Sequence, residues 1–153
     1  MSLIQEYNYP MSNITIYTDG AARGNPGPGG YGGILDYRGK RKNYSGGEEH
    51  TTNNRMELTA VIKGLKMLKE PCDVHVISDS SYVVKAINEW LDNWIRKDFA
   101  KVKNVDLWMS YLEAAEPHHI KATWVRGHSG HEENEICDQL AREEAEKIKK
   151  RKK

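Results

Sequence analysis

Four acidic residues stand where their carboxylates would project from strand ends or from helices. Asp19 follows one alternating apolar segment, and Asp79 follows another. Glu57 lies in the first turns of an expected helix, and Asp138 lies on a later one. Hard divalent cations prefer oxygen ligands, and carboxylates in such places commonly build Mg²⁺ sites. The four residues therefore predict metal-assisted chemistry on a phosphate.

Each carboxylate also has a structural explanation. Asp19 precedes a glycine, which is typical of a turn, and Asp79 precedes a serine, which is typical of a helix N-cap. Glu57 and Asp138 would then be solvated positions on helix faces. The metal site is favoured because all four residues occur together, within the motifs described below.

His128 lies in a glycine-flanked run that ends at His131. An imidazole titrates near neutrality, so such a residue can carry a proton or help a product to leave. The structural alternative is an ordinary surface-loop histidine. A zinc site made of His128, His131 and Cys137 is a further alternative, but the sequence offers no clear fourth ligand.

Composition narrows the class of protein. The 153 residues fit one domain, and 23 basic against 22 acidic residues argue against binding nucleic acid by net charge alone. The two cysteines form no CxxC pair, so a disulfide framework is not expected. No apolar run is long enough for a transmembrane helix, and the N-terminus lacks the pattern of a secretory signal. We expect a cytoplasmic protein.

Hydrophobic periodicity predicts an α/β fold with a mixed five-stranded sheet. The first three strands should form an antiparallel meander, to which later strands add in parallel, with helices on the faces. A Gly- and Pro-rich loop is expected over Gly20 to Gly30. The predicted strands are residues 14–18, 31–37, 42–46, 74–78 and 120–125, and the predicted helices are residues 53–69, 80–94, 105–115 and 132–149.

Five motifs in order carry a family resemblance. They are Tyr17-Thr18-Asp19-Gly20, the Gly-rich run from Gly24 to Gly32, Thr51-Thr52-Asn53-Asn54-Arg55-Met56-Glu57-Leu58, Ser78-Asp79-Ser80, and Trp124-Val125-Arg126-Gly127-His128-Ser129-Gly130-His131. With Asn134-Glu135 and Cys137-Asp138, the chain closely resembles ribonuclease H of type 1, the bacterial-type enzyme. The resemblance implies a ribonuclease H-like sheet and an endonuclease that cuts the RNA strand of RNA–DNA hybrids. It also implies 5′-phosphate and 3′-hydroxyl products and no sequence preference.

The resemblance assigns roles to the acids. Two Mg²⁺ ions, with Mn²⁺ as the alternative, would be held by Asp19, Glu57, Asp79 and Asp138, and Asp19 would bridge them. Glu57 would also contact the RNA 2′-hydroxyl. His128 would be the proton carrier.

The resemblance also places neutral polar residues against the substrate. Thr52 and Asn104 would face a DNA phosphate, and Asn25 and Asn53 would lie along the minor groove, where contacts position the hybrid without reading bases. Turn and capping chemistry is the alternative for Thr52 and Asn25.

Trp90 and Trp94 share one helix face and are expected to contact the DNA strand. The alternative is that both rings belong to the core. The cations that follow, between Arg96 and Lys103, occupy a shorter stretch than in many relatives, and it contains Asp98. Ser81 stands where many relatives have Gln, so one substrate contact is in doubt.

The domain organisation expected is a lead-in over residues 1–12, a catalytic domain over residues 13–147, and a basic tail over residues 148–153. The tail is either solvated or an electrostatic tether for phosphate. The expected partner is an RNA–DNA hybrid, with no membrane and a monomeric state. A DNA-cleaving nuclease of the same fold and a non-catalytic hybrid-binding module are the alternatives.

Overall fold

The computed structural model describes residues 11–127 and 130–151. The strands are β1 (Ser12–Ala22), β2 (Gly27–Tyr37), β3 (Lys40–Thr51), β4 (Cys72–Ser78) and β5 (His119–Trp124). The helices are α1 (Asn53–Lys66), α2 (Ser81–Lys85), the π-helical segment η2 (Ala86–Trp90), α3 (Leu91–Arg96), α4 (Val105–Ala115) and α5 (Glu132–Arg151).

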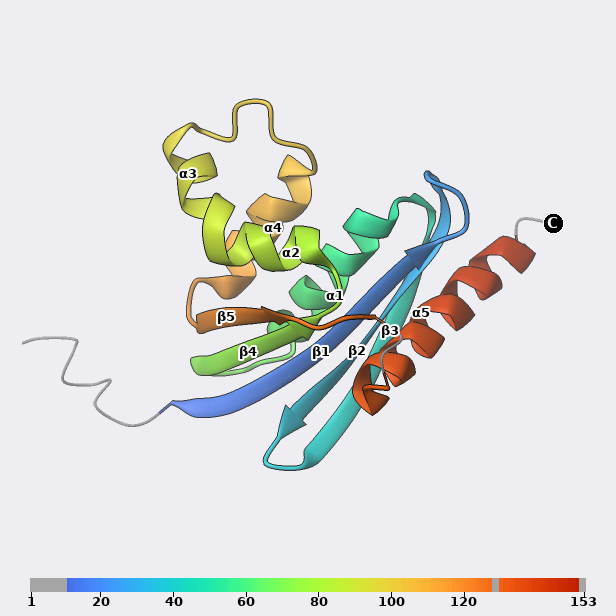
Figure 1. Cartoon of the computed structure of the whole chain (residues 1–153), viewed down its shortest axis with the longest axis horizontal. Coiled ribbons are helices and arrows are strands. Elements are labelled where there is room, and N and C mark those ends of the chain that lie inside the picture. Colours follow the sequence, from blue (N-terminus) through green and yellow to red (C-terminus); the bar gives the residue numbers. More distant parts are fainter. Residues whose placement is uncertain (1–10, 128–129, 152–153) are drawn as a thin grey trace, which may run out of the picture.

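The strands form one mixed sheet in the order β3-β2-β1-β4-β5 (Figure 1). β1, β2 and β3 pair antiparallel, whereas β4 pairs parallel with both β1 and β5. The predicted fold class is therefore confirmed: an antiparallel meander is extended by parallel strands. The parallel additions follow from the helices that connect them, since a parallel neighbour needs a crossover.

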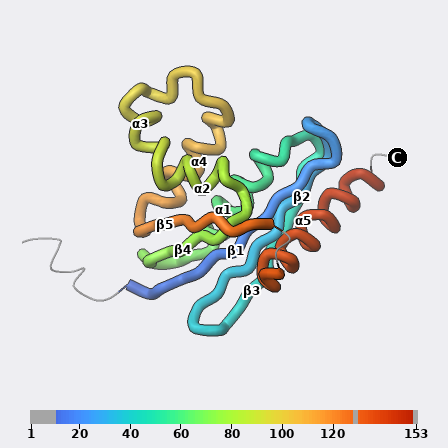
Figure 2. Tube along the Cα trace, in the orientation of Figure 1, coloured from blue at the N-terminus to red at the C-terminus, as the bar shows by residue number. Residues whose placement is uncertain are grey.

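Helices cover both faces of the sheet. α5 lies along the face formed by β1 to β3, and α1 to α4 gather on the other side (Figures 1 and 2). The main apolar core lies between the sheet and α1, α2 and α4 and includes Ile16, Val76, Leu58 and Trp108. No helix among the described residues is both long and apolar enough to cross a bilayer.

The loop expected over Gly20 to Gly30 is much shorter in the structure. β1 continues to Ala22 and β2 begins at Gly27, so only residues 23–26 connect them. The glycines serve packing instead: a Cβ on Gly30 would overlap the Ala141 carbonyl of α5, and one on Gly29 would overlap Thr51. Turn-forming composition is therefore misleading here, because small residues are required where helix and sheet approach closely.

The hairpin between β2 and β3 is confirmed. Arg38 and Gly39 form its two-residue turn, with φ values of 53° and 85°. Positive φ at both positions matches the twist of antiparallel strands. β3 is longer than predicted and reaches Thr51.

Several element boundaries differ from the predictions. α1 ends at Lys66 rather than Lys69, because its last turn tightens and the Met67 N–H bonds the Gly64 and Leu65 carbonyls. The helix predicted over residues 80–94 is interrupted by η2 and continues to Arg96. β1 begins at Ser12, inside the expected lead-in. α5 extends to Arg151, and its Ile148 is buried, so the basic end of the chain is helical to that residue.

Candidate metal and nucleic-acid site

Three carboxylates converge from three elements. Asp19 comes from β1, Asp79 directly follows β4, and Glu57 lies on α1; one ligand oxygen from each lies within 4.8 Å of the others. The parallel register explains the first pair, because Thr18 lies opposite Ser78 and the next residue of each strand is the aspartate. Oxygens this close together suit a shared divalent cation.

Gly20 brings α1 against the sheet. A Cβ at this position would overlap the backbone of Met56 and Glu57, so a larger residue would push α1 away from β1. Glu57 is thereby buried beside Asp19. The turn expected from Asp19-Gly20 is replaced by a close contact between helix and strand, since both residues belong to β1.

Burial and mutual repulsion disfavour full ionisation of this group. Burial, followed by the charge of Asp79, raises the pKa of Asp19 to about 7, although the Gly20 N–H donates to Asp19 Oδ1 at 2.8 Å. Burial and the charges of Asp19 and Asp79 raise the pKa of Glu57 well above its ordinary value. Within the described part of the chain, Glu57 Oε2 is buried and has no hydrogen-bond partner. Such an orphaned carboxylate oxygen is costly in the protein alone, and a cation would satisfy it.

Asp138 lies near this group but not in it. Its Oδ2 accepts a hydrogen bond from Arg142 Nε at 2.9 Å, one turn along α5. Its charge contributes to the raised pKa of Asp19, so the two carboxylates interact. The structure thus brings three of the four predicted acids together and pairs the fourth with an arginine. His128, the predicted proton carrier, lies outside the described residues.

The segment after β5 packs against Asp79. A Cβ on Gly127 would lie 2.7 Å from Asp79 Oδ2, and the Trp124 indole Nε1 donates to the Asp79 carbonyl at 3.0 Å. The N-cap of α2 is Ser80, whose hydroxyl accepts from the Val83 N–H at 3.2 Å, rather than Asp79. Cys137 of the alternative zinc set is fully buried, and its thiol contacts the Tyr17 carbonyl.

The polar residues at the start of α1 have structural partners. Thr52 caps the helix by accepting from the Arg55 N–H at 3.2 Å, as the alternative interpretation predicted. Asn53 Oδ1 accepts from the Ala22 N–H at 2.6 Å and so fixes the end of β1 to the start of α1. Asn25 is exposed in the connection between β1 and β2.

Asn104 lies in a network that the sequence did not reveal. It precedes α4 in a left-handed conformation, with φ 60°. Its Oδ1 accepts from Arg55 Nη1 at 3.3 Å, and its Nδ2 donates to the Tyr82 hydroxyl at 3.1 Å. Arg55 also binds Asp106. The carboxamide is therefore held in one orientation, and an amide N–H₂ group has a second hydrogen to offer a phosphate.

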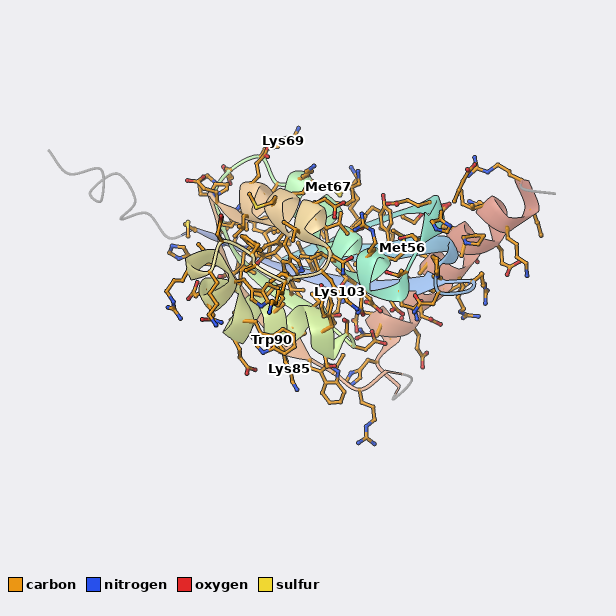
Figure 3. The ribbon with its side chains drawn as sticks, turned by 90° about the horizontal axis from the view of Figure 1, so that it is seen from above. Met56, Met67, Lys69, Lys85, Trp90 and Lys103 are labelled. Carbon is orange, nitrogen blue, oxygen red and sulfur yellow. The ribbon has the colours of Figure 1, made fainter. Side chains whose placement is uncertain are left out.

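The two tryptophans differ in environment. Trp90 is exposed, and its ring centroid lies 5.8 Å from that of Trp94. Trp94 packs edge-on against the buried Trp108, so it is partly a core residue. Trp90 and Lys85 project from the same outer side of the α2–η2 stretch (Figure 3). An exposed aromatic ring beside a cation suits contact with a nucleic-acid strand.

The cationic segment after Trp94 is compact. Asp98, Phe99 and Lys101 all have positive φ, and the Phe99 N–H returns to the Trp94 carbonyl at 2.8 Å. The basic side chains on this segment are exposed: Arg96, Lys97, Lys101 and Lys103.

Comparison with known proteins identifies relatives along nearly the whole chain. Residues 11–146 match the RNase H family. A protein of Sulfurovum named ribonuclease H is 75% identical over 136 residues, which cover 89% of this chain and 92% of that relative. Ribonuclease HI of Helicobacter pylori is 58% identical over 137 residues, which cover 90% of this chain and 96% of the relative.

Solved structures share the fold. LC9-RNase H1, described as a type 1 RNase H with the type 2 active-site motif, aligns with a TM-score of 0.83 at 29% identity. The alignment covers 92% of this chain and 75% of that one. LC11-RNase H1, solved in complex with an RNA/DNA hybrid, aligns with a TM-score of 0.67 at 27% identity, covering 88% of this chain and 97% of the other.

Proposed function

This chain belongs to the ribonuclease H family, and we infer from that membership that it is an endonuclease that hydrolyses the RNA strand of RNA–DNA hybrids. The observation that carries the inference is the convergence of Asp19, Glu57 and Asp79 within 4.8 Å. A non-catalytic hybrid-binding module would have no use for three carboxylates whose burial and mutual repulsion raise the pKa of two of them.

Asp19, Glu57, Asp79 and Asp138 would hold two Mg²⁺ ions, with Mn²⁺ as the alternative. The donor set fits, because all four are carboxylates and Glu57 Oε2 is buried with no hydrogen-bond partner among the residues that the structure describes. Two bound divalent ions would supply an activated water and stabilise the leaving oxygen.

The protein's own groups prepare this chemistry. The Gly20 N–H orients Asp19 by donating to Oδ1. Gly127 packs against the carboxylate of Asp79, and Arg142 holds that of Asp138. Glu57, on the rigid first turns of α1, is proposed to accept the 2′-hydroxyl of the RNA, the group that DNA lacks. His128 is proposed to carry the proton away from the site.

The hybrid is proposed to bind across α1 and the α2–α4 region. Thr52 and Asn104 would bind a phosphate of the DNA strand, Asn25 and Asn53 would lie along the minor groove, and Trp90 and Trp94 would contact DNA sugars. Two supporting facts are the fixed carboxamide of Asn104 and the exposed ring of Trp90. These contacts read no base, so cleavage would lack sequence preference. The products are proposed to carry 5′-phosphate and 3′-hydroxyl ends, which requires that the P–O3′ bond is the one broken.

The remaining proposals concern the whole protein. The catalytic domain, predicted as residues 13–147, is proposed to include Ser12 of β1 and to follow α5 to Arg151, so the lead-in and the basic tail would be shorter than predicted. The protein acts as a monomer in the cytoplasm.

A gel assay with end-labelled substrates tests the function. The full chain should cleave an RNA–DNA hybrid in Mg²⁺, leave duplex RNA and duplex DNA intact, and stop cleaving when EDTA is added. Cleavage of duplex DNA would instead identify a DNA nuclease of the same fold, and binding of the hybrid without cleavage would identify a binding module.

A further inference from the structure

Trp124 is an exposed aromatic residue beside the candidate metal ligands. Its side chain is 48% exposed, although large aromatic residues are usually buried. Its indole Nε1 donates to the main-chain carbonyl of Asp79 at 3.0 Å. The ring therefore lies next to the carboxylate cluster with much of its surface uncovered by protein.

The backbone around Trp124 is held firmly on both sides. Two residues earlier, the Asn88 carboxamide donates to the Ala122 carbonyl at 2.8 Å and accepts from the Ala122 N–H at 3.2 Å. One residue later, the Val125 N–H donates to the Ser78 carbonyl at 3.0 Å. With the indole N–H bound as well, the ring is ordered before any ligand arrives, which lowers the entropy cost of binding.

Trp124 is separate from the aromatic array around Trp90. The close ring pairs of the described residues run from Trp90 through Trp94 to Trp108, and from Trp108 to Tyr82 and Tyr111. That array provides apolar packing within α2 to α4. Packing accounts for the buried rings of the array and the proposed DNA contact for the exposed ring of Trp90, whereas neither explains the exposed surface of Trp124.

The position of Trp124 indicates which strand it meets. Under the proposed function, on which this inference rests, the carboxylates would hold divalent cations beside the phosphate that is cleaved, and this phosphate belongs to RNA. A ring bound to the carbonyl of Asp79 would then be close to a neighbouring nucleotide of the same strand. Paired bases face inward, so the sugar is the apolar surface within reach. We propose that the exposed surface of Trp124 packs against the ribose of the RNA nucleotide adjacent to the cleaved phosphate.

Two crossed substitutions separate the ring from its N–H group. Trp124→Phe keeps a flat ring and loses the donor, whereas Trp124→Gln keeps an N–H donor and loses the ring. The dissociation constant of a fluorescent hybrid is measured by anisotropy in an Asp19→Asn background, which prevents cleavage. Met109→Gln, at an exposed residue on α4, is the control for loss of surface hydrophobicity.

A ring contact predicts an asymmetric result. Trp124→Gln should weaken hybrid binding about fivefold or more, the lower end of what an aromatic contact with nucleic acid supplies. Trp124→Phe and Met109→Gln should stay within about twofold of the parent. Any other pattern overturns the proposal; in particular, a Phe variant as weak as the Gln variant would mean that the N–H positions Asp79.

Truncated hybrids test the strand. In one truncated hybrid the RNA lacks the nucleotides 5′ to the cleavage position, and in the other it lacks those 3′ to it. The effect of Trp124→Gln should disappear in the hybrid that lacks the nucleotide contacted by the ring and persist in the other. An effect that survives both truncations would assign the contact to DNA and overturn the proposal. Wild-type cleavage of the intact hybrid is measured alongside, because failure there refutes the proposed function rather than the role of Trp124.

Discussion

The Arg55 guanidinium and the Asp106 carboxylate form a two-point ion pair that joins α1 to α4. Arg55 Nη1 lies 2.9 Å from Asp106 Oδ1, and Nη2 lies 2.6 Å from Oδ2. The same Nη1 donates to Asn104 Oδ1. The backbone N–H of Arg55 also donates to the capping hydroxyl of Thr52. The two residues proposed to bind one DNA phosphate are therefore connected through a single arginine.

We predict that Arg55→Lys raises the KM for the hybrid several-fold with little change in kcat. A lysine ammonium cannot make the planar two-point contact, so Asn104 loses its fixed orientation while the carboxylates are untouched. The stability loss should be about 1 kcal/mol or less, because Asp106 is largely exposed. Arg41→Lys is the matched control, since Arg41 pairs with Asp36 and Glu133 instead. An equal rise in KM for both variants would contradict the prediction.

We predict that Asp19→Asn abolishes cleavage yet stabilises the metal-free protein at neutral pH. The pKa of Asp19 is raised to about 7 from 3.8, so between these values the folded protein keeps a proton that the unfolded chain releases. The free energy of unfolding of the wild type must therefore fall as pH rises through this window. In EDTA, the variant should melt roughly 5 °C above the wild type at pH 7.5 and much closer to it at pH 4. A difference in melting temperature that does not change with pH would show that the raised pKa of Asp19 is not its cause.

Magnesium binding should depend on pH in the opposite sense. A metal ligand must be deprotonated, and the raised pKa of Asp19 makes protons compete with the cation below about pH 7. Titration calorimetry should give an affinity on the order of tenfold higher at pH 8 than at pH 6. Asp36→Asn, which removes a carboxylate bound to Arg41, should leave both values unchanged. A pH-independent affinity would show that Asp19 is not a ligand.

We predict that Gly127→Ala lowers kcat at least tenfold with little loss of stability. The new Cβ would lie 2.7 Å from Asp79 Oδ2, so the carboxylate must shift and its position relative to Asp19 and Glu57 must change. Gly39→Ala is the informative control. Nothing lies within 4 Å of its new Cβ, but its φ of 85° is unfavourable for alanine, so it should cost about 1 kcal/mol of stability without affecting turnover. Full activity of Gly127→Ala would mean that Asp79 tolerates displacement.

Local sequence patterns predicted the sheet and the meeting of Asp19 with Asp79. Each aspartate ends an alternating segment, and once two such segments pair in parallel their ends must coincide. The same patterns could not show that β1 and β2 continue through glycines. Those glycines are required by close contacts with helices that lie much later in the sequence.

Contacts between distant residues explain what else the sequence left open. Arg55 lies inside the Asn-Asn-Arg-Met-Glu motif, but its partner Asp106 is 51 positions away, and no local pattern around Asp106 indicates the ion pair. Trp124 likewise lies inside one of the five motifs, but only the structure shows that its indole N–H donates to the Asp79 carbonyl. The position of Asp138 on a helix groups it with the other acids, but its pairing with Arg142 depends on the side-chain rotamers within one helix turn.

The double hydrogen bond between Asn88 and Ala122 also protects the sheet from unwanted association. β5 is an outer strand, and the Asn88 carboxamide occupies both the donor and the acceptor that Ala122 would otherwise offer to a strand of another molecule. The opposite edge strand, β3, carries exposed charges at Lys40, Lys42 and Glu48. Exposed edge strands of β-sheets are templates for aggregation, and side chains that bond their free backbone groups or carry charge suppress it. A side chain that steadies the surroundings of Asp79 thus also helps the molecule to resist fibril growth.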